Sequence, residues 1–111
     1  MGRHREIFEW EVPAGVVEIV RAICADYRRR EHMIKFSNIS GDTLAEYIRL
    51  NEIVDNAIGN VEKGIRGSLL ADIVRGKGYD NSMASPYLAK NTYYARKRKI
   101  VYDIAAQLRL V

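Results

Sequence analysis

A run of four cations, Arg96-Lys97-Arg98-Lys99, is the part of this 111-residue sequence whose residue types most clearly suggest a chemistry. Thr92 and Ala95 precede it and place short side chains beside the long cationic ones. Arg and Lys neutralise phosphates, and both also donate hydrogen bonds to guanine edges in the major groove of DNA. The run therefore indicates contact with a nucleic-acid duplex. Runs of this kind are most often solvated helix faces, and that alternative stays open.

The surrounding segment, 87–111, contains no glycine or proline and predicts a helix of about five turns. Its second half carries an apolar stripe made of Ile100, Val101, Ile104, Ala105 and Leu108. Its first half carries the basic run and small residues on the other side. A helix with one side against a scaffold and a cationic side facing outward fits the recognition helix of a DNA-binding protein. Asn91 is the best capping residue, although the helix could begin at Ala89.

The candidate DNA-binding residues lie within one stretch of this helix: Lys90, Asn91, Thr92, Arg96, Lys97, Arg98 and Lys99. With a rotation of about 100° per residue, Thr92, Arg96 and Lys99 face away from the apolar stripe. We assign these three residues to the major groove.

The other four candidates are expected to contact phosphates. Lys90, Asn91 and Arg98 are three of them. Lys97 lies toward the core side with Tyr93, and its long side chain would have to extend to reach a phosphate. Tyr93 and the following tyrosine are expected to pack at the hinge before the helix and not to contact DNA.

Charge is distributed unevenly along the chain, whose net charge is +4. Residues 75–111 hold eight cations and two anions, a net charge of +6, which leaves −2 for residues 1–74. A basic C-terminal third on a slightly acidic body predicts a polyanionic partner. A membrane surface is the less favoured partner, because the charged half of the helix lacks bulky apolar residues. No run of about 18 apolar residues predicts a membrane span.

Apolar periodicity and an ordinary composition, 48% hydrophobic and 29% charged, predict one all-α domain, a small bundle of four to five helices over residues 1–111. An extended arm, 1–12, with Phe8 and Trp10 would precede an N-terminal helical pair over 13–62. The predicted helices span 14–35, 43–60 and 63–75, with Ser40 or Asp42 capping the second and Gly76 ending the third.

Residues 63–111 predict a helix-turn-helix, because a shorter helix, a turn-rich segment and a long basic helix follow one another. The turn-rich segment, 76–91, contains large side chains that we expect to hold it to the core: Tyr79, Met83, Tyr87 and Leu88.

Catalytic and metal-binding patterns are missing from the sequence. His4 and His32 have no partner at metal-ligand spacing, and Gly76-Lys77-Gly78 lacks the spacing of a phosphate-binding loop. We therefore expect neither an enzyme nor a cofactor. Cys24 is the only cysteine, which is typical of a buried residue in a protein of the reducing cytoplasm.

Residues 65–111 carry a more specific signature, in the strings Gly78-Tyr79, Ala84-Ser85-Pro86-Tyr87-Leu88, Thr92-Tyr93-Tyr94-Ala95-Arg96-Lys97-Arg98 and Ile104-Ala105-Ala106-Gln107-Leu108. This region resembles phage late-gene transcription regulators of the RinA and ArpU type. Those proteins, from phages and prophages of Gram-positive bacteria, end in a helix-turn-helix like that of sigma-factor region four. The sequence departs from them at Ala89, where Ser or Thr often caps the last helix, and at Pro86, which falls inside the preceding helix.

The resemblance implies promoter binding and activation of phage late genes in the bacterial cytoplasm. It implies that Thr92 and the basic run contact double-stranded DNA, with RNA polymerase and a second copy of the chain as further candidate partners. Two other functions remain open from the residues: a DNA-packaging adaptor of the small-terminase kind, and a helical module that binds an acidic protein.

Overall fold

A computed structural model of the chain describes residues 11–111, and the predicted arm with Phe8 and Trp10 lies almost entirely outside the described residues. The described part contains helices and no strand, which confirms the all-α prediction. Its α-helices are α2 (Ala14–Ala25), α3 (Tyr27–Phe36), α4 (Gly41–Ile58), α5 (Arg66–Arg75) and α6 (Lys90–Gln107). Two 3-10 turns, η2 (Lys63–Ile65) and η3 (Tyr79–Asn81), flank α5.

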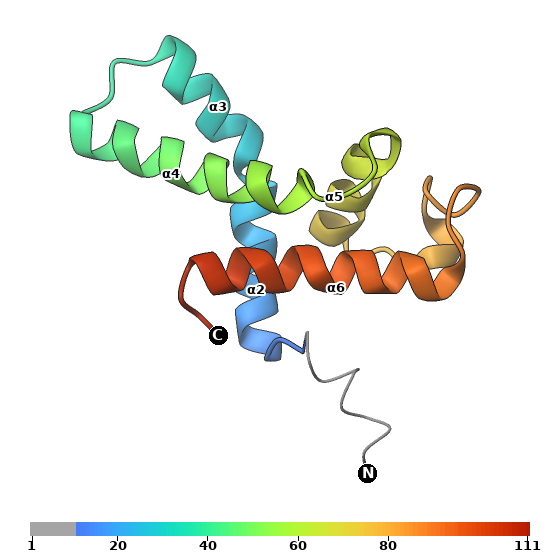
Figure 1. Cartoon of the computed structure of the whole chain (residues 1–111). Coiled ribbons are helices and arrows are strands. Elements are labelled where there is room, and N and C mark those ends of the chain that lie inside the picture. The colour runs from blue at the N-terminus through green and yellow to red at the C-terminus, as the bar shows by residue number, and fades with distance from the viewer. Residues whose placement is uncertain (1–10) are drawn as a thin grey trace.

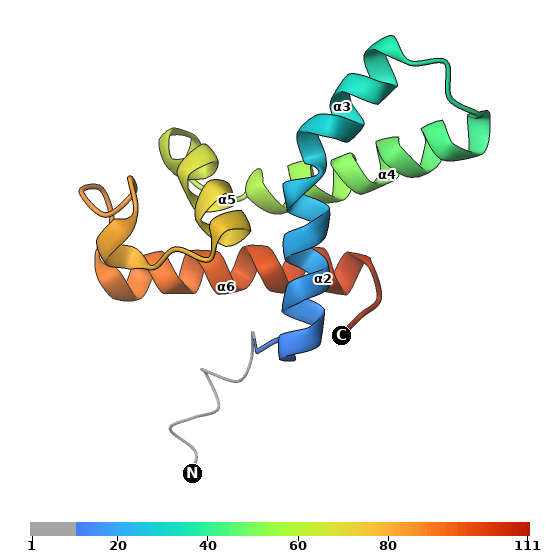
Figure 2. The ribbon, with the colours of Figure 1, turned by 180° about the vertical axis from the view of Figure 1, so that it is seen from behind.

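The core lies where α6 crosses α2 and runs beside α4 (Figures 1 and 2). α5 packs against α2, whereas α3 and α4 form a hairpin that projects away from α5 (Figure 2). Every helix from α2 to α6 except α3 contributes fully buried apolar side chains, among them Val20, Val54, Leu69, Ile100 and Ile104. α6 is thereby anchored on one side by the packed helices. Each helix of residues 11–111 is too short or too polar to cross a bilayer.

The helix predicted over 14–35 is wrong as a single helix, because the chain bends at Asp26. Asp26 has φ −91° and ψ 2°, and α2 and α3 leave it in different directions (Figure 1). The carboxylate of Asp26 accepts two hydrogen bonds of 2.7 Å from Arg29. This interaction holds the pKa of Asp26 below its usual value.

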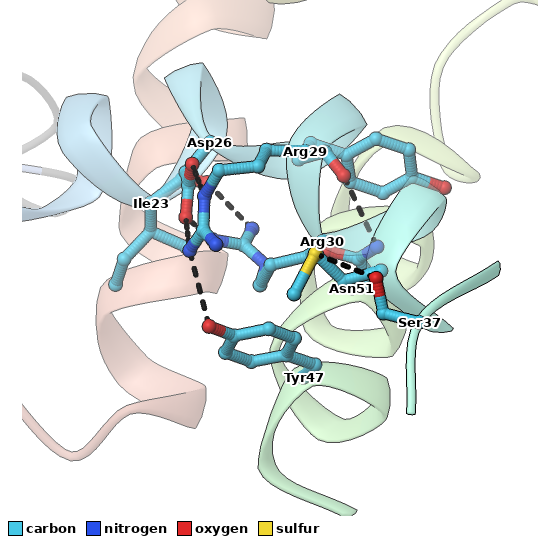
Figure 3. Close-up of polar contacts among 9 residues, drawn as sticks. Ile23, Asp26, Arg29, Arg30, Ser37, Tyr47 and Asn51 are labelled. Atoms are coloured by element: carbon cyan, nitrogen blue, oxygen red, sulfur yellow. Dashed lines mark hydrogen bonds and ion pairs between the residues drawn. The ribbon is translucent and has the colours of Figure 1, made fainter. Parts of the chain in front are cut away.

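A buried arginine, Arg30, holds the bend against α4 (Figure 3). Its guanidinium donates to the Ile23 carbonyl at 2.6 Å and to Asn51 Oδ1 at 2.7 Å. Asn51 in turn donates from its amide to the Tyr27 carbonyl at 3.3 Å. Burial lowers the pKa of Arg30, because the charged form loses its hydration. The three bonds therefore satisfy polar groups of α2, α3 and α4 that cannot reach bulk water.

The remaining helix boundaries follow the predictions closely. α4 begins two residues before the predicted position, and Ser40 Oγ accepts from the Thr43 amide at 3.3 Å as its N-cap. The predicted third helix, 63–75, forms as η2 followed by α5. Gly76 ends it in the left-handed conformation with φ 68°, as its residue type predicts.

The connection between α5 and α6 differs from a typical helix-turn-helix. Residues 76–89 separate the two helices, whereas the turn of that motif usually has about three to four residues. The segment contains η3 and a series of turns in place of a second short helix. The order of elements matches the prediction, but the hinge is a folded loop of its own.

Asn51→Ala should lower the free energy of unfolding by about 1–3 kcal/mol, because it leaves the buried Arg30 without one acceptor. Urea denaturation measures the change. Arg49→Ala is the matched control on α4, since its partner Glu46 lies in solvent and an exposed pair contributes about 0–1 kcal/mol. An equal loss in both variants would contradict the role given to Arg30.

Candidate nucleic-acid interface

α6 begins at Lys90, and this start determines which side chains lead the helix. Ala89 is the N-cap, with extended φ −66° and ψ 152° and no side-chain hydrogen bond. The prediction that Asn91 caps the helix is therefore wrong, since Asn91 is the second helical residue. The 18 residues of α6 make a helix about 27 Å long. Its first ten residues include all seven predicted DNA-binding residues.

The inner side of α6 agrees with the predicted apolar stripe. Tyr93, Ile100, Ile104 and Ala105 are buried, and Val101 and Leu108 pack against the core with partial exposure. Because the buried positions recur along one side of the helix, the opposite side remains outward. In Figure 1, no other described element crosses in front of α6.

A buried carboxylate joins the first turn of α6 to α5 and to the connecting loop. Asp72, on α5, accepts a 2.8 Å hydrogen bond from the Tyr93 hydroxyl and a second, short one from Ser82 Oγ. Burial and this hydrogen bond raise the pKa of Tyr93 to about 12. Tyr93 is thus a hinge residue, as the sequence predicts, and Asp72 and Ser82 are hinge residues that the sequence analysis missed.

Tyr79 and Tyr94 complete the hinge. The Tyr79 hydroxyl lies 2.7 Å from the Leu88 carbonyl and 3.0 Å from the Ser85 carbonyl, and its backbone amide donates to the Tyr94 hydroxyl at 3.2 Å. The rings of Tyr79 and Tyr93 meet edge to face, with centroids 5.3 Å apart. The connecting segment is therefore held along its length by side-chain bonds to its own carbonyls and to α6.

Two residues predicted to anchor this segment do not do so. Met83 is 79% exposed and Tyr87 is 74% exposed, so the prediction that they hold the loop to the core is wrong. Tyr79 and the backbone bonds of the turns hold the segment instead, which leaves these two side chains directed to solvent.

Lys97 lies toward the core side, as the helical wheel predicts, and belongs to the hinge. Its ammonium group donates to the Lys77 carbonyl at 2.6 Å and lies 5.2 Å from the centroid of the Tyr93 ring. Desolvation in this position lowers its pKa. Reaching a phosphate would require Lys97 to give up both contacts.

The three residues assigned to the major groove lie on the side of α6 that borders α4. Arg96 Nε bonds Glu62 Oε1 at 3.0 Å, and this bond holds the pKa of Glu62 below its usual value. Lys99 pairs with Asp103 at 3.2 Å, one helical turn further on. Thr92 is partly buried. The Arg96 guanidinium is therefore shared with an exposed carboxylate of the segment after α4.

Three of the four residues assigned to phosphates lie outward, as does Lys99 from the groove set. Lys90, Asn91 and Arg98 are exposed, and Asn91, Ala95 and Arg98 follow one another at the four- and three-residue spacing of one helix face. The sequence contains no Asp or Glu between Asp80 and Asp103. The N-terminal half of α6 thus presents positive charge and amide groups without a carboxylate of its own.

The chain matches no protein-family model, no curated protein and no solved structure. Within residues 11–111, no group of three or more His, Cys, Asp or Glu side chains is placed to hold a metal ion.

Tyr93→Phe should lower the free energy of unfolding by about 1–3 kcal/mol, because it removes one donor from the buried Asp72. The raised pKa of Tyr93 adds stability that is complete below pH 10 and is lost as the pH rises toward 12. The difference between wild type and variant should therefore shrink over that interval in urea titrations. Tyr87→Phe removes an exposed hydroxyl and should change neither the free energy of unfolding nor its dependence on pH. Equal effects of the two substitutions would contradict the role given to Tyr93.

Proposed function

We propose that this chain is a DNA-binding transcription regulator that places the outer side of the N-terminal half of α6 in the major groove. One observation carries the proposal: the inner side of α6 is packed in the core, while Lys90, Asn91 and Arg98 of the same helix are exposed. A side chain on a fixed helix reaches base edges or phosphates at a reproducible position, which sequence recognition requires.

The roles of the candidate residues follow from their surroundings. Asn91 and Arg98 can offer hydrogen bonds to base edges or phosphates from the outer side, and Lys90 supports them from the first helical position. Arg96 and Lys99 lie at the border of the interface and would leave their carboxylate partners to bind DNA. Lys97 acts through the hinge, where it holds the Lys77 carbonyl.

The biological setting of the proposal is supported by the resemblance of 65–111 to phage late-gene regulators. We infer an activator of phage or prophage late genes that acts in the cytoplasm of the bacterial host, with RNA polymerase and a second copy of the chain as candidate partners. Selection of bound sequences from a random duplex pool tests the proposal, and enrichment of one motif is expected. A pool without enrichment, or no duplex binding at low salt, would overturn it.

Two other functions give different results in solution. A packaging adaptor of the small-terminase kind should form a ring, so its mass by light scattering should be that of a large oligomer. A module that binds acidic proteins should show no sequence preference among duplexes. The exposed Met83 and Tyr87 are the observation that favours an interaction module.

Arg98→Ala should weaken binding to the selected duplex by about 1–3 kcal/mol and reduce the salt dependence by about one released ion if the guanidinium meets a phosphate. Fluorescence anisotropy at several stated salt concentrations measures both effects. Arg49→Ala also removes one exposed arginine, but from α4. A similar loss with Arg49→Ala would mean that overall charge, and not the face of α6, determines affinity.

Glu62→Gln should strengthen duplex binding by roughly two- to fivefold, because Arg96 no longer has to leave a carboxylate to reach DNA. Glu46→Gln is the matched control, since it also removes one carboxylate that pairs with an exposed arginine. Equal gains in the two variants would show that Arg96 takes no part in the interface.

A further inference from the structure

The connecting loop exposes two large apolar side chains at the N-terminal end of α6. Met83 and Tyr87 are 79% and 74% exposed, and the intervening Pro86 is exposed as well. Figures 1 and 2 show that the loop stands at that end of α6, away from the α3–α4 hairpin. A single exposed apolar residue is ordinary, but here two large ones lie within five positions of one loop, and we refer to this pair as the apolar patch.

The loop presents this patch on a fixed backbone. The Tyr87 amide donates to the Ala84 carbonyl at 2.9 Å, and the Ala84 amide donates to Ser82 Oγ at 3.0 Å. Ala84 is fully buried, and Ser82 bonds the buried Asp72. Met83 and Tyr87 thus flank a residue anchored in the core. Little backbone entropy remains to be lost when they meet a partner.

The electrostatic surroundings indicate the chemistry of that partner. Asp80 lies in the loop before Met83, but residues 81–102 contain no Asp or Glu, and Lys90 follows Tyr87 by three residues. An apolar patch followed by a cation fits the surface of a nucleic-acid groove, where sugars and base edges lie between two rows of phosphates. Side chains such as Met and Pro serve as apolar wedges in minor grooves.

We propose that Met83 and Tyr87 form an apolar DNA contact that packs on deoxyriboses and base edges in the minor groove next to the major-groove segment held by α6. This inference rests on the proposed function and extends it, because it assigns to the loop a contact that carries no charge. The patch adds affinity through buried apolar area, whereas the cations of α6 add affinity through released counterions.

The experiment compares Tyr87→Ala and Met83→Ala with Phe36→Ala on the selected duplex. Phe36 is also 74% exposed, but it ends α3 at the far tip of the hairpin. Anisotropy titrations at several salt concentrations give the affinity and the salt slope. Hydroxyl-radical footprinting reports which deoxyriboses each protein shields. All three residues are exposed, so thermal unfolding should show intact folds.

Tyr87→Ala should bind about fivefold or more weakly, with an unchanged salt slope and with loss of protected deoxyriboses at one edge of the footprint. Met83→Ala should show a smaller effect in the same direction, and Phe36→Ala should match wild type. Wild-type affinity and footprint in the Tyr87→Ala variant would overturn the inference and leave the proposed function standing. That result combined with lost transcription activation would assign the patch to a protein partner. Failure of the wild-type protein to bind any duplex would overturn the proposed function itself.

Discussion

The orientation of α6 depends on one buried carboxylate. Asp72 is 4% exposed and belongs to α5, and it collects hydroxyl donors from the connecting loop and from the first turn of α6. An unpaired buried charge would be strongly unfavourable, so Ser82 and Tyr93 have to stay beside it. These bonds therefore hold the long connection between α5 and α6 in one conformation. The outward side of α6 is determined by this hinge as much as by the aliphatic core.

The same hinge divides the cations of α6 into groups with different surroundings. Lys97 points inward because Tyr93 and the Lys77 carbonyl receive it, and Arg98, the next residue, consequently points outward. Arg96 lies on the opposite border, where Glu62 meets it. A run of four cations thus supplies fewer free charges than the sequence suggests. The charge available to a polyanion is concentrated at the N-terminal end and on the outer stripe.

Helices with clear periodicity and end signals were predictable from the sequence: α4 with its Ser40 cap, α5 with Gly76, and the inner side of α6. The bend at Asp26 was not, because its stabilisation depends on Arg30 meeting Asn51, two residues far apart in the chain. The exposed positions of Met83 and Tyr87 were also mispredicted, because burial depends on the tertiary packing beneath the loop. Apolar type favours burial, but Tyr79 and Ala84 already fill the space beneath the loop.

The pairing of Arg96 with Glu62 means that, in the proposed interface, this arginine has to leave a carboxylate before it can bind a phosphate. The guanidinium lies within reach of the outer side, yet in the free protein an exposed carboxylate already satisfies two of its donors. Exposed ion pairs are weak, so a phosphate can displace the carboxylate without disturbing the fold. After displacement, the Glu62 carboxylate would lie beside the phosphates and repel them. This repulsion opposes binding wherever Arg96 makes a poor contact with the phosphate. If α6 binds DNA as proposed, such a pair would weaken association with unselected DNA more than association with a well-matched site, and would so contribute to specificity through repulsion.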